Sequence, residues 1–272
     1  MAVRANTLSG REWLLNSFSV WRDFTKDNNR KLHPAAFPLA LVKKVLDCYA
    51  PGAESLVLDP FAGSGSVLLA ATHAHMRSVG MDINAKYEAV FHDRLDIFSS
   101  PAQGNKLWRY EVCDARDRIA FFNVVQKNSV DVCVTSPPYW DILRRRRSSD
   151  GKDAVAYSDM DTDIGNITGY DEFLDALSDV MKNVTSALKP RGYLILNVMD
   201  LRKGSKFYPL HQDCAVLVQK NDSMTLDDII IWDRQKDYSQ MRPLGYPHKF
   251  IINKVHEYLL VFRKIGGRNA AT

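Results

Sequence analysis

The fold is decided by residues 55–66, which read SLVLDPFAGSGS. The first four form a short, largely apolar run that predicts a buried strand. Gly63 and Gly65 then predict a tight turn whose backbone can approach a ligand closely, because glycine has no side chain. Residues 67–75 continue with a helical pattern. The stretch therefore predicts a strand, a glycine-rich turn and a helix whose N-terminal amides point at a bound ligand.

The rest of the chain alternates strand patterns with helix patterns. Further strands are predicted at 78–81, 109–113, 130–134, 193–198, 229–232 and 258–262. Helices are predicted at 39–49, 85–98, 170–188 and 210–220, together with an amphipathic helix within 11–24 that packs on the main body. Such alternation predicts an α/β fold with a parallel sheet and helices on both faces. The last two strands have no clear helix between them, so we expect them to pair antiparallel at the sheet edge.

A second stretch, TSPPYW at 135–140, directly follows the strand predicted at 130–134. Pro137 and Pro138 fix the backbone and remove two N–H donors, while their carbonyls remain acceptors. The oxygen of Ser136 and the carbonyl of Pro137 can then face one point, beside the ring of Tyr139. The stretch predicts a socket for a planar group that bears an NH2, such as a nucleobase. An ordinary turn at the end of a strand is the alternative.

Acidic residues follow two more of the predicted strands. Asp82 lies at the end of the strand 78–81, where an acid meets ribose hydroxyls in nucleotide-binding sheets. Asp114 ends the next strand and is placed to accept from an adenine amino group, or else to cap a helix. The turn at Gly63 lacks both a third glycine and a following Gly-Lys-Ser/Thr, so no pyrophosphate is required of the ligand. These residues predict an adenosine derivative.

The two stretches together resemble the DNA amino-methyltransferases. Residues 59–65 are similar to the S-adenosylmethionine motif of that family. Residues 136–139 are similar to its catalytic motif, Asp/Asn/Ser-Pro-Pro-Tyr/Phe/Trp. LKPRG at 188–192 resembles a Leu-x-Pro-Gly-Gly turn with Arg191 in place of a glycine, and HEYLLVF at 256–262 resembles the last strand.

The resemblance covers roughly residues 31–264. It implies a Rossmann-like class I methyltransferase fold with a seven-stranded, mostly parallel sheet and an antiparallel edge strand. It also implies S-adenosyl-L-methionine as the cofactor, bound by His33, Pro34, Asp59, Phe61, Gly63, Gly65, Asp82 and Asp114. The catalytic residues would be Ser136, Pro137, Pro138 and Tyr139.

The serine form of the motif, preceded by threonine, is typical of enzymes that methylate the N4 amine of cytosine. The absence of a Pro-Cys pair at this strand argues against cytosine C5 chemistry. Methylation of adenine N6, of RNA or of protein glutamine remains open, and so does a nucleotide-binding module without catalysis. The resemblance favours a site-specific enzyme that modifies double-stranded DNA within a restriction system, where its partner would be a cognate restriction endonuclease.

Basic residues predict the DNA contacts. The run Arg144, Arg145, Arg146 and Arg147 follows the catalytic stretch, where it would lie beside phosphates unless it is a solvated charge run. Arg242 and Lys249 lie in a second basic and aromatic insertion. The stretch between Asp114 and Thr135 is too short for a target-recognition domain. We therefore expect recognition from insertions near 141–169 and 233–250, or from the N-terminal extension 1–30.

Composition sets the remaining expectations. A chain of 272 residues favours one large domain over two small ones, and the resemblance implies that residues 1–272 form a single methyltransferase domain. Either a monomer or a homodimer is left open. The four cysteines are widely spaced without a Cys-x-x-Cys pair, so neither zinc nor a disulfide framework is expected. No signal peptide and no run of 18 apolar residues occurs, so the sequence predicts no membrane span and a reducing cytoplasm.

Overall fold

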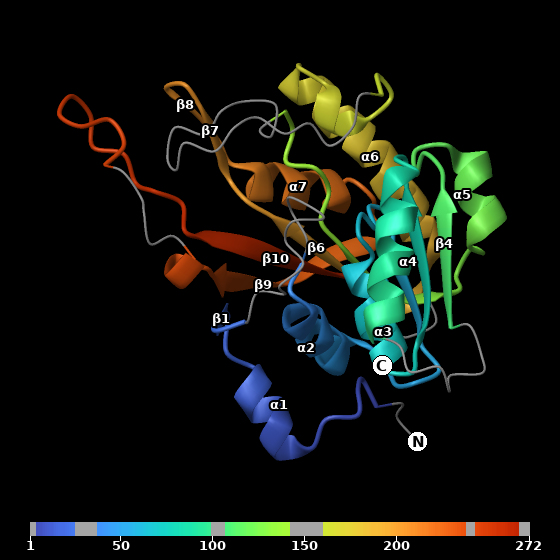
Figure 1. The fold of residues 1–272 in the computed structure, drawn as a ribbon. Coiled ribbons are helices and arrows are strands. Elements are labelled where there is room, and N and C mark those ends of the chain that lie inside the picture. The colour runs from blue at the N-terminus through green and yellow to red at the C-terminus, as the bar shows by residue number, and fades with distance from the viewer. Residues whose placement is uncertain (1–3, 25–36, 99–106, 142–159, 238–242, 267–272) are drawn as a thin grey trace.

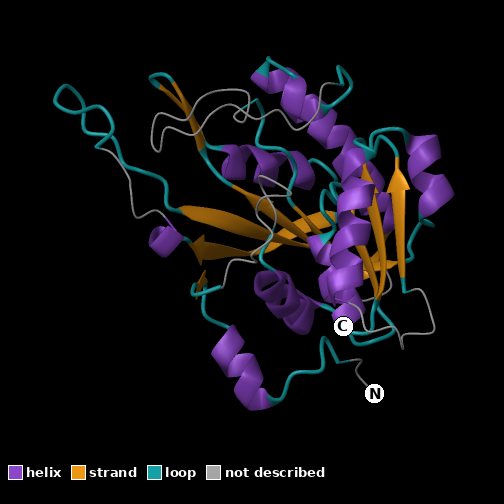
Figure 2. Ribbon diagram, viewed as in Figure 1, coloured by secondary structure: helices purple, strands orange, loops and turns teal. Residues whose placement is uncertain are grey.

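The computed structural model describes residues 4–24, 37–98, 107–141, 160–237 and 243–266. A central sheet has helices on both faces (Figures 1 and 2). Its strand order is β1-β9-β10-β6-β5-β2-β3-β4. In chain order the strands are β1 (Val20–Trp21), β2 (Leu56–Asp59), β3 (Arg77–Asp82), β4 (Trp108–Val112), β5 (Val130–Thr135), β6 (Leu188–Val198), β9 (Met224–Asp233) and β10 (His256–Lys264).

The α/β fold and all seven predicted strands are confirmed, and the sheet is mostly parallel. Two details differ from the prediction. The described sheet has eight strands, because residues 20–21 add a short strand parallel to β9. The antiparallel strand, β10, lies between β6 and β9 rather than at the edge. Since no crossover helix separates β9 from β10, the chain reverses there, and the hairpin pairs with the sheet through its second strand.

The helices of the main body follow the predicted pattern closely. They are α2 (Leu39–Tyr49), α3 (Ser66–His73), α4 (Lys86–Phe98), α6 (Tyr170–Ala187) and α7 (Leu210–Gln219). A further helix, α5 (Arg118–Val124), was not predicted. It is only seven residues long, and its start is marked by Asp117, whose carboxylate accepts from the amides of Ile119 and Ala120. None of the described helices is both long and apolar enough to span a bilayer.

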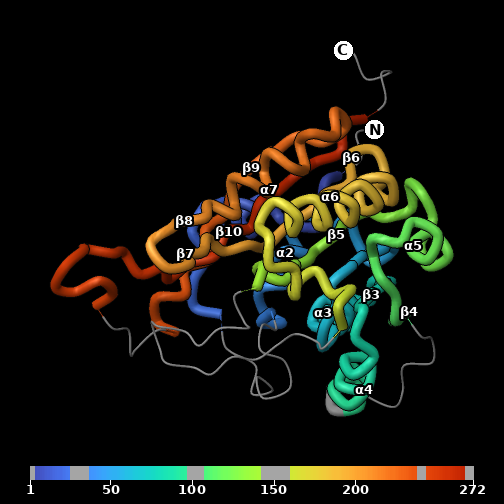
Figure 3. Tube along the Cα trace, turned by 90° about the horizontal axis from the view of Figure 1, so that it is seen from above, coloured from blue at the N-terminus to red at the C-terminus, as the bar shows by residue number. Residues whose placement is uncertain are grey.

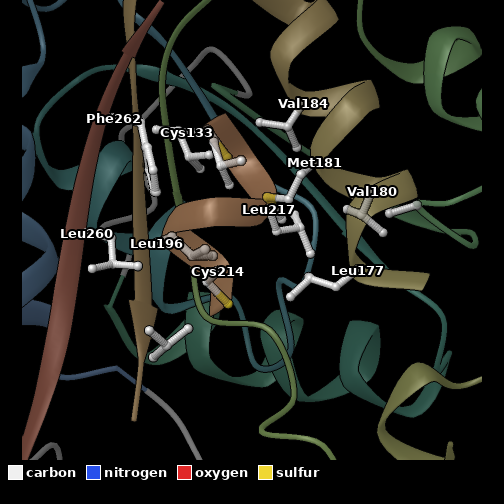
Figure 4. Close-up of a cluster of buried hydrophobic side chains, with 14 of the residues drawn as sticks. Cys133, Leu177, Val180, Met181, Val184, Leu196, Cys214, Leu217, Leu260 and Phe262 are labelled. Atoms are coloured by element: carbon white, nitrogen blue, oxygen red, sulfur yellow. The ribbon is translucent and has the colours of Figure 1, made fainter. Parts of the chain in front are cut away.

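Two apolar clusters hold the layers together. One packs α5, α6 and α7 against one face of the sheet, and Figure 4 shows its centre, where Cys133, Met181, Leu196, Cys214 and Phe262 lie close together. The other packs α2, α3 and α4 against the opposite face. The view from above shows α4 on one side of the sheet and α6 and α7 on the other (Figure 3). Burial of Cys133 and Cys214 raises the pKa of both thiols, which suits inert core residues.

The N-terminal helix differs from its prediction. Helix α1 spans only Gly10–Asn16, and Ser9 and Glu12 form a capping box at its start. Its apolar side chains do not pack on the main body, since Trp13 and Leu14 are 50% and 64% exposed. Trp21, expected to extend the helical stripe, instead lies buried in β1 with the ammonium group of Lys44 over its ring. Pairing with β9 therefore fixes this segment, whereas the apolar side chains of α1 contribute little burial.

Candidate cofactor and catalytic site

A pocket lies at the carboxyl ends of β2, β3 and β5, together with the residues after β4. The parallel sheet brings these ends to one edge, which is the usual binding edge of open α/β sheets. Among the predicted site residues, the pocket walls contain Asp59, Phe61, Gly63, Asp82, Asp114, Ser136, Pro137 and Pro138. Phe37, Ile83, Tyr87 and Val180 add apolar surface. The glycine turn (residues 59–65) and the SPPY turn (residues 136–139) therefore border the same space.

Asp59 links the two turns. Its carboxylate accepts a hydrogen bond of 2.7 Å from the hydroxyl of Thr135 and one of 3.1 Å from the amide of Phe61. Burial raises its pKa to about 7, although both hydrogen bonds oppose the shift. Near neutral pH the carboxyl group is therefore poised between its neutral and ionised forms, beside the pocket.

Asp82 shapes the glycine turn from the neighbouring strand. Its Oδ2 accepts from the amide of Gly63 at 2.9 Å, and its Oδ1 accepts from the amide of Asn84. Burial raises its pKa to about 6, with the two amide bonds acting in the opposite direction. The carbonyl of Gly63 is fixed in turn by the hydroxyl of Tyr110 at 2.8 Å. Asp82, predicted to meet ribose hydroxyls, thus also holds the turn at Gly63, and its carboxylate borders the pocket.

Asp114 also borders the pocket, but it already has a cationic partner. Arg116 makes hydrogen bonds to both carboxylate oxygens, the shortest at 2.6 Å, and also donates to the carbonyl of Thr162. The aspartate is therefore held in place by a two-pronged contact of the kind that arginine makes with carboxylates. Arg116 was not predicted as a site residue, and nothing local in the sequence distinguishes it from other loop arginines.

Gly65 has a different task from Gly63. It is not part of the pocket wall, and it precedes α3 with a φ of +75°. A Cβ atom at this position would lie 2.1 Å from the ring of Phe91 on α4. The glycine is therefore required by a left-handed backbone and by close packing between α3 and α4, and its predicted approach to the ligand stays a prediction.

Arg94 holds the end of the glycine turn through hydrogen bonds from α4. It is buried in α4, and its guanidinium group donates to the carbonyl and hydroxyl of Ser64 and to the hydroxyl of Ser66. No role was predicted for this residue, because an arginine within an amphipathic helix gives no sign that it points inward. Its three contacts fix the residues between the turn and α3.

Residues 136–139, the SPPY turn, take part in a buried hydrogen-bond network. Ser136 lines the pocket, and its hydroxyl lies 3.1 Å from the hydroxyl of Tyr139. Tyr139 donates to the carboxylate of Glu257 at 2.7 Å and accepts from the side-chain amide of Asn197 at 2.7 Å. Glu257 also pairs with Arg234. Asn197 lies in β6, Glu257 at the start of β10, and Arg234 directly after β9. No role was predicted for Asn197 or Glu257, whereas Arg234 falls in the insertion 233–250 that was expected to read the target.

Tyr139, whose ring was expected beside the planar group in the socket, is packed into the core. It is only 9% exposed, belongs to the core cluster, and is not among the residues that line the pocket. The adjoining Trp140 is buried with a φ of +52°, an uncommon conformation for a bulky residue. The ammonium group of Lys203 lies 3.7 Å from the centre of its ring and 2.8 Å from the carboxylate of Asp141. The end of the turn is thus held from several sides.

Several predicted residues lie outside the described part of the chain. These are His33, Pro34, Arg144, Arg145, Arg146, Arg147 and Arg242. Lys249 is described and exposed, in a loop after η3 (Gln235–Asp237) that projects beyond one end of the sheet (Figure 1). It does not line the pocket.

The chain matches the family model N6_N4_Mtase, described as DNA methylase, over residues 4–93 and 130–269. The matched ranges contain both turns and the three strands that meet in the buried network. The chain belongs to the N4/N6 DNA methylase family. The resemblance seen in the two stretches is thereby confirmed at the level of the family, which does not distinguish cytosine N4 from adenine N6.

Two curated relatives of this methylase illustrate the extent of the match. It is 36% identical to the Type II methyltransferase M.HpaI of Haemophilus parainfluenzae over 85 residues, which cover 30% of the chain and 26% of the relative. It is 29% identical to the Type II methyltransferase M.MthZI of Methanothermobacter thermautotrophicus over 164 residues, covering 56% of the chain and 44% of that protein. The matches therefore span less than half the length of either relative.

Among solved structures, TrmN from Thermus thermophilus superposes with a TM-score of 0.51 at 16% identity, covering 85% of the chain and 50% of that protein. This likeness confirms the fold. S-adenosyl-L-methionine is the cofactor of the methylase, as the family match indicates. The pocket suits such a group, because carboxylates that can accept from hydroxyl and amino groups, at Asp82 and Asp114, stand beside apolar side chains such as Ile83.

Proposed function

We propose that this methylase transfers a methyl group from S-adenosylmethionine to the N4 amino group of a cytosine flipped out of double-stranded DNA. The observation that carries the proposal is the position of Ser136 in the wall of the pocket that also contains Asp59, Gly63 and Asp82. The serine form of the SPPY turn therefore stands beside the cofactor residues, where a base and a methyl donor would have to meet.

The chemistry follows from the acceptors of this turn. A cytosine amine is a poor nucleophile, because its lone pair is delocalised into the ring. The oxygen of Ser136 and the carbonyl of Pro137 would accept its two hydrogens and favour a more tetrahedral nitrogen. The cofactor, when bound, would supply an electrophilic methyl group on a sulfonium and would leave as a neutral thioether. The proton that the methylated amine loses would pass to solvent. The residues of the turn position the amine, and positioning together with exclusion of water provides most of the rate.

The remaining cofactor residues are proposals of the same kind. Asp82 would accept from the ribose and Asp114 from the adenine amine, while Asp59 and Phe61 would complete the wall near the SPPY turn. Gly63 lets the turn pass close to the ligand, and His33 and Pro34 would cover its methionine end. Pro138 would keep the SPPY turn rigid. Gly65, by contrast, acts through the packing of α3 against α4.

DNA contact is proposed for the basic segments that follow the SPPY turn. Arg144, Arg145, Arg146 and Arg147 would meet phosphates, and Arg242 and Lys249 would contact the duplex from the second insertion. Within the described residues, the exposed loop around Lys249 also presents Phe250, which is 90% exposed. Basic and apolar side chains on one exposed loop suit a nucleic-acid surface. A base inside a duplex cannot reach the pocket, so it must flip out at a cost of about a few kcal/mol.

Two wider proposals follow from the relatives. M.HpaI and M.MthZI are described as Type II methyltransferases, which supports a role for this chain as the modification half of a restriction system. A cognate endonuclease would then recognise the same DNA sequence. We also propose that residues 1–272 act as one methyltransferase domain, in which the segments 141–169 and 233–250 read the target.

The deciding experiment is an assay of the modified nucleoside. The protein is incubated with methyl-labelled S-adenosylmethionine and mixed duplex DNA, the DNA is digested, and the nucleosides are identified by mass. We expect N4-methylcytosine. N6-methyladenine would assign the enzyme to the adenine branch of the family, and label in parallel RNA but not in DNA would overturn the DNA proposal. Cofactor binding without any transfer would indicate a binding module.

A further inference from the structure

The carboxylate of Glu257 is 3% exposed and lies behind the SPPY turn, away from the pocket wall. It receives hydrogen bonds from the hydroxyl of Tyr139 at 2.7 Å and from the side-chain amide of Asn197, and it pairs with the guanidinium group of Arg234. Arginine and the amide NH2 group can only donate, and an ionised carboxylate can only accept. The hydroxyl of Tyr139 must therefore donate to Glu257.

This arrangement fixes the next hydrogen bond in the chain. Tyr139 has one hydroxyl proton, which it uses in the hydrogen bond to Glu257. The phenolic oxygen can therefore only accept from Ser136. The hydroxyl of Ser136 lies 3.1 Å from that oxygen and 3.3 Å from the carbonyl of Asn197, and both are acceptors. In either position its proton points into the network. One lone pair of Ser136 faces the side-chain amide of Asn197 at 3.5 Å, which leaves the other for the pocket that Ser136 lines.

Asn197 supports the same direction. Its side-chain nitrogen contacts the carboxylate of Glu257 and the phenolic oxygen of Tyr139. If the amide were turned the other way, its oxygen would face the carboxylate oxygen of Glu257 and the two would repel each other. The amide therefore presents its NH2 group to the network, which supplies the phenolic oxygen with a second donor. Antiparallel pairing of β10 makes these contacts possible, because it places the first residues of β10 at the edge where β5 and β6 end.

We propose that Glu257, acting through Tyr139, is the positioning residue that makes Ser136 a hydrogen-bond acceptor for the target amine. This inference rests on the proposed function. A lone serine hydroxyl can either donate or accept, and a donating hydroxyl would face the N–H groups of the amine with its own proton. By keeping the phenolic oxygen an acceptor, the buried carboxylate adds to the carbonyl of Asn197 a second acceptor for the proton of Ser136 before the substrate binds.

The test uses Tyr139→Phe, which keeps the buried ring and removes the linking hydroxyl. We expect the single-turnover rate of methyl transfer to fall by roughly tenfold, the rate equivalent of one neutral hydrogen bond. KM for the cofactor and affinity for DNA should stay within about twofold, since the network does not line the pocket beyond Ser136. The matched control is Tyr170→Phe on α6, which removes a 2.6 Å hydrogen bond from a tyrosine to Asp213 but keeps the ring that packs on Trp140. It should leave the rate unchanged.

A rescue experiment distinguishes positioning from a general structural role. Ser136→Asn provides a carbonyl acceptor whose direction does not depend on Tyr139, so Tyr139→Phe should cost much less activity in that background. A wild-type single-turnover rate in Tyr139→Phe, or an equal loss in both backgrounds, would overturn the inference. Glu257→Gln should lower the rate as Tyr139→Phe does. If Glu257→Gln does not fold, the comparison of Tyr139→Phe in the wild-type and Ser136→Asn backgrounds still tests the inference. Failure of the proposed function is recognised separately, by the absence of methylated nucleoside with the native protein.

Discussion

The hydroxyl of Thr135 donates a hydrogen bond of 2.7 Å to Oδ1 of Asp59, although the two residues are 76 positions apart. It joins the last residue of β5 to the last residue of β2, and these two strands are paired neighbours in the sheet. The contact therefore holds the SPPY turn beside the glycine turn. It also places a buried carboxyl group with a raised pKa at the junction of the two.

The first prediction concerns stability and pH. In the folded protein the pKa of Asp59 is raised from 3.8 to about 7 by burial, so the folded state holds a proton that the unfolded chain has lost between these pH values. The free energy of unfolding should therefore fall as pH rises through this window, with a slope of about 1.4 kcal/mol per pH unit. Asp59→Asn lacks this pH dependence, so its stability relative to that of the wild type should increase as pH rises. Urea unfolding of both proteins at several pH values measures these free energies. The prediction fails if the free energy of unfolding changes equally with pH in the two proteins.

The second prediction concerns Asp82 and the cofactor. Asp82→Asn should weaken binding of S-adenosylmethionine by roughly 1–3 kcal/mol, the loss of a charged hydrogen-bond partner. In the wild type, affinity should rise with pH up to about 6, because burial raises the pKa of Asp82 to that value and a cationic ligand favours the ionised form. Calorimetry in buffers of different ionisation enthalpy should detect release of protons on binding. Asp93→Asn, an exposed change on α4, is the control, and unchanged affinity in Asp82→Asn would remove this residue from the site.

The third prediction concerns the backbone of Arg191. This residue stands where the resembled motif has a glycine, and its φ is +68°. A left-handed conformation costs a non-glycine residue about 1–2 kcal/mol. Arg191→Gly should therefore stabilise the protein by roughly 1 kcal/mol, after allowing for the greater freedom of glycine in the unfolded chain. A lower denaturation midpoint in urea would contradict this account. Gly192→Ala is the opposite control, because its Cβ atom would lie 2.9 Å from the carbonyl oxygen of Lys189.

The fourth prediction concerns DNA contact by Arg144, Arg145, Arg146 and Arg147. Replacing all four by alanine should weaken DNA binding and flatten the dependence of log K on log salt, because fewer counterions are released. A matched control removes four exposed cations from other parts of the surface, at Arg77, Arg109, Lys127 and Lys220. An equal salt slope in the arginine variant and the wild type would show that the run is a solvated surface.

The fifth prediction concerns Ser136. Ser136→Ala removes the acceptor that borders the pocket, so methyl transfer should fall severely while affinity for S-adenosylmethionine stays within a few fold, since the glycine turn is unchanged. Single-turnover assays and calorimetry on the same preparation give both numbers. Near-native turnover would remove Ser136 from the reaction.

The sequence by itself determined the alternating fold and the two turns that border the pocket. Those features depend on short-range signals: apolar runs for β2 and β5, glycines for the first turn and prolines for the second. It could not define the role of Gly65, because that role depends on Phe91 of α4, which lies in contact only after folding. Nor could it foresee that α1 leaves its apolar side chains exposed, since periodicity predicts a helix but does not identify what the helix packs against.

Only the tertiary structure decided what lies behind Ser136. Asn197, Arg234 and Glu257 are far apart in the sequence, and none stands in a pattern that marks a site. They meet because β10 runs antiparallel between β6 and β9, which brings the start of one strand to the ends of the others. Strand pairing over such separations depends on the whole sheet, so no local pattern could have revealed the carboxylate that directs the hydroxyl of Tyr139.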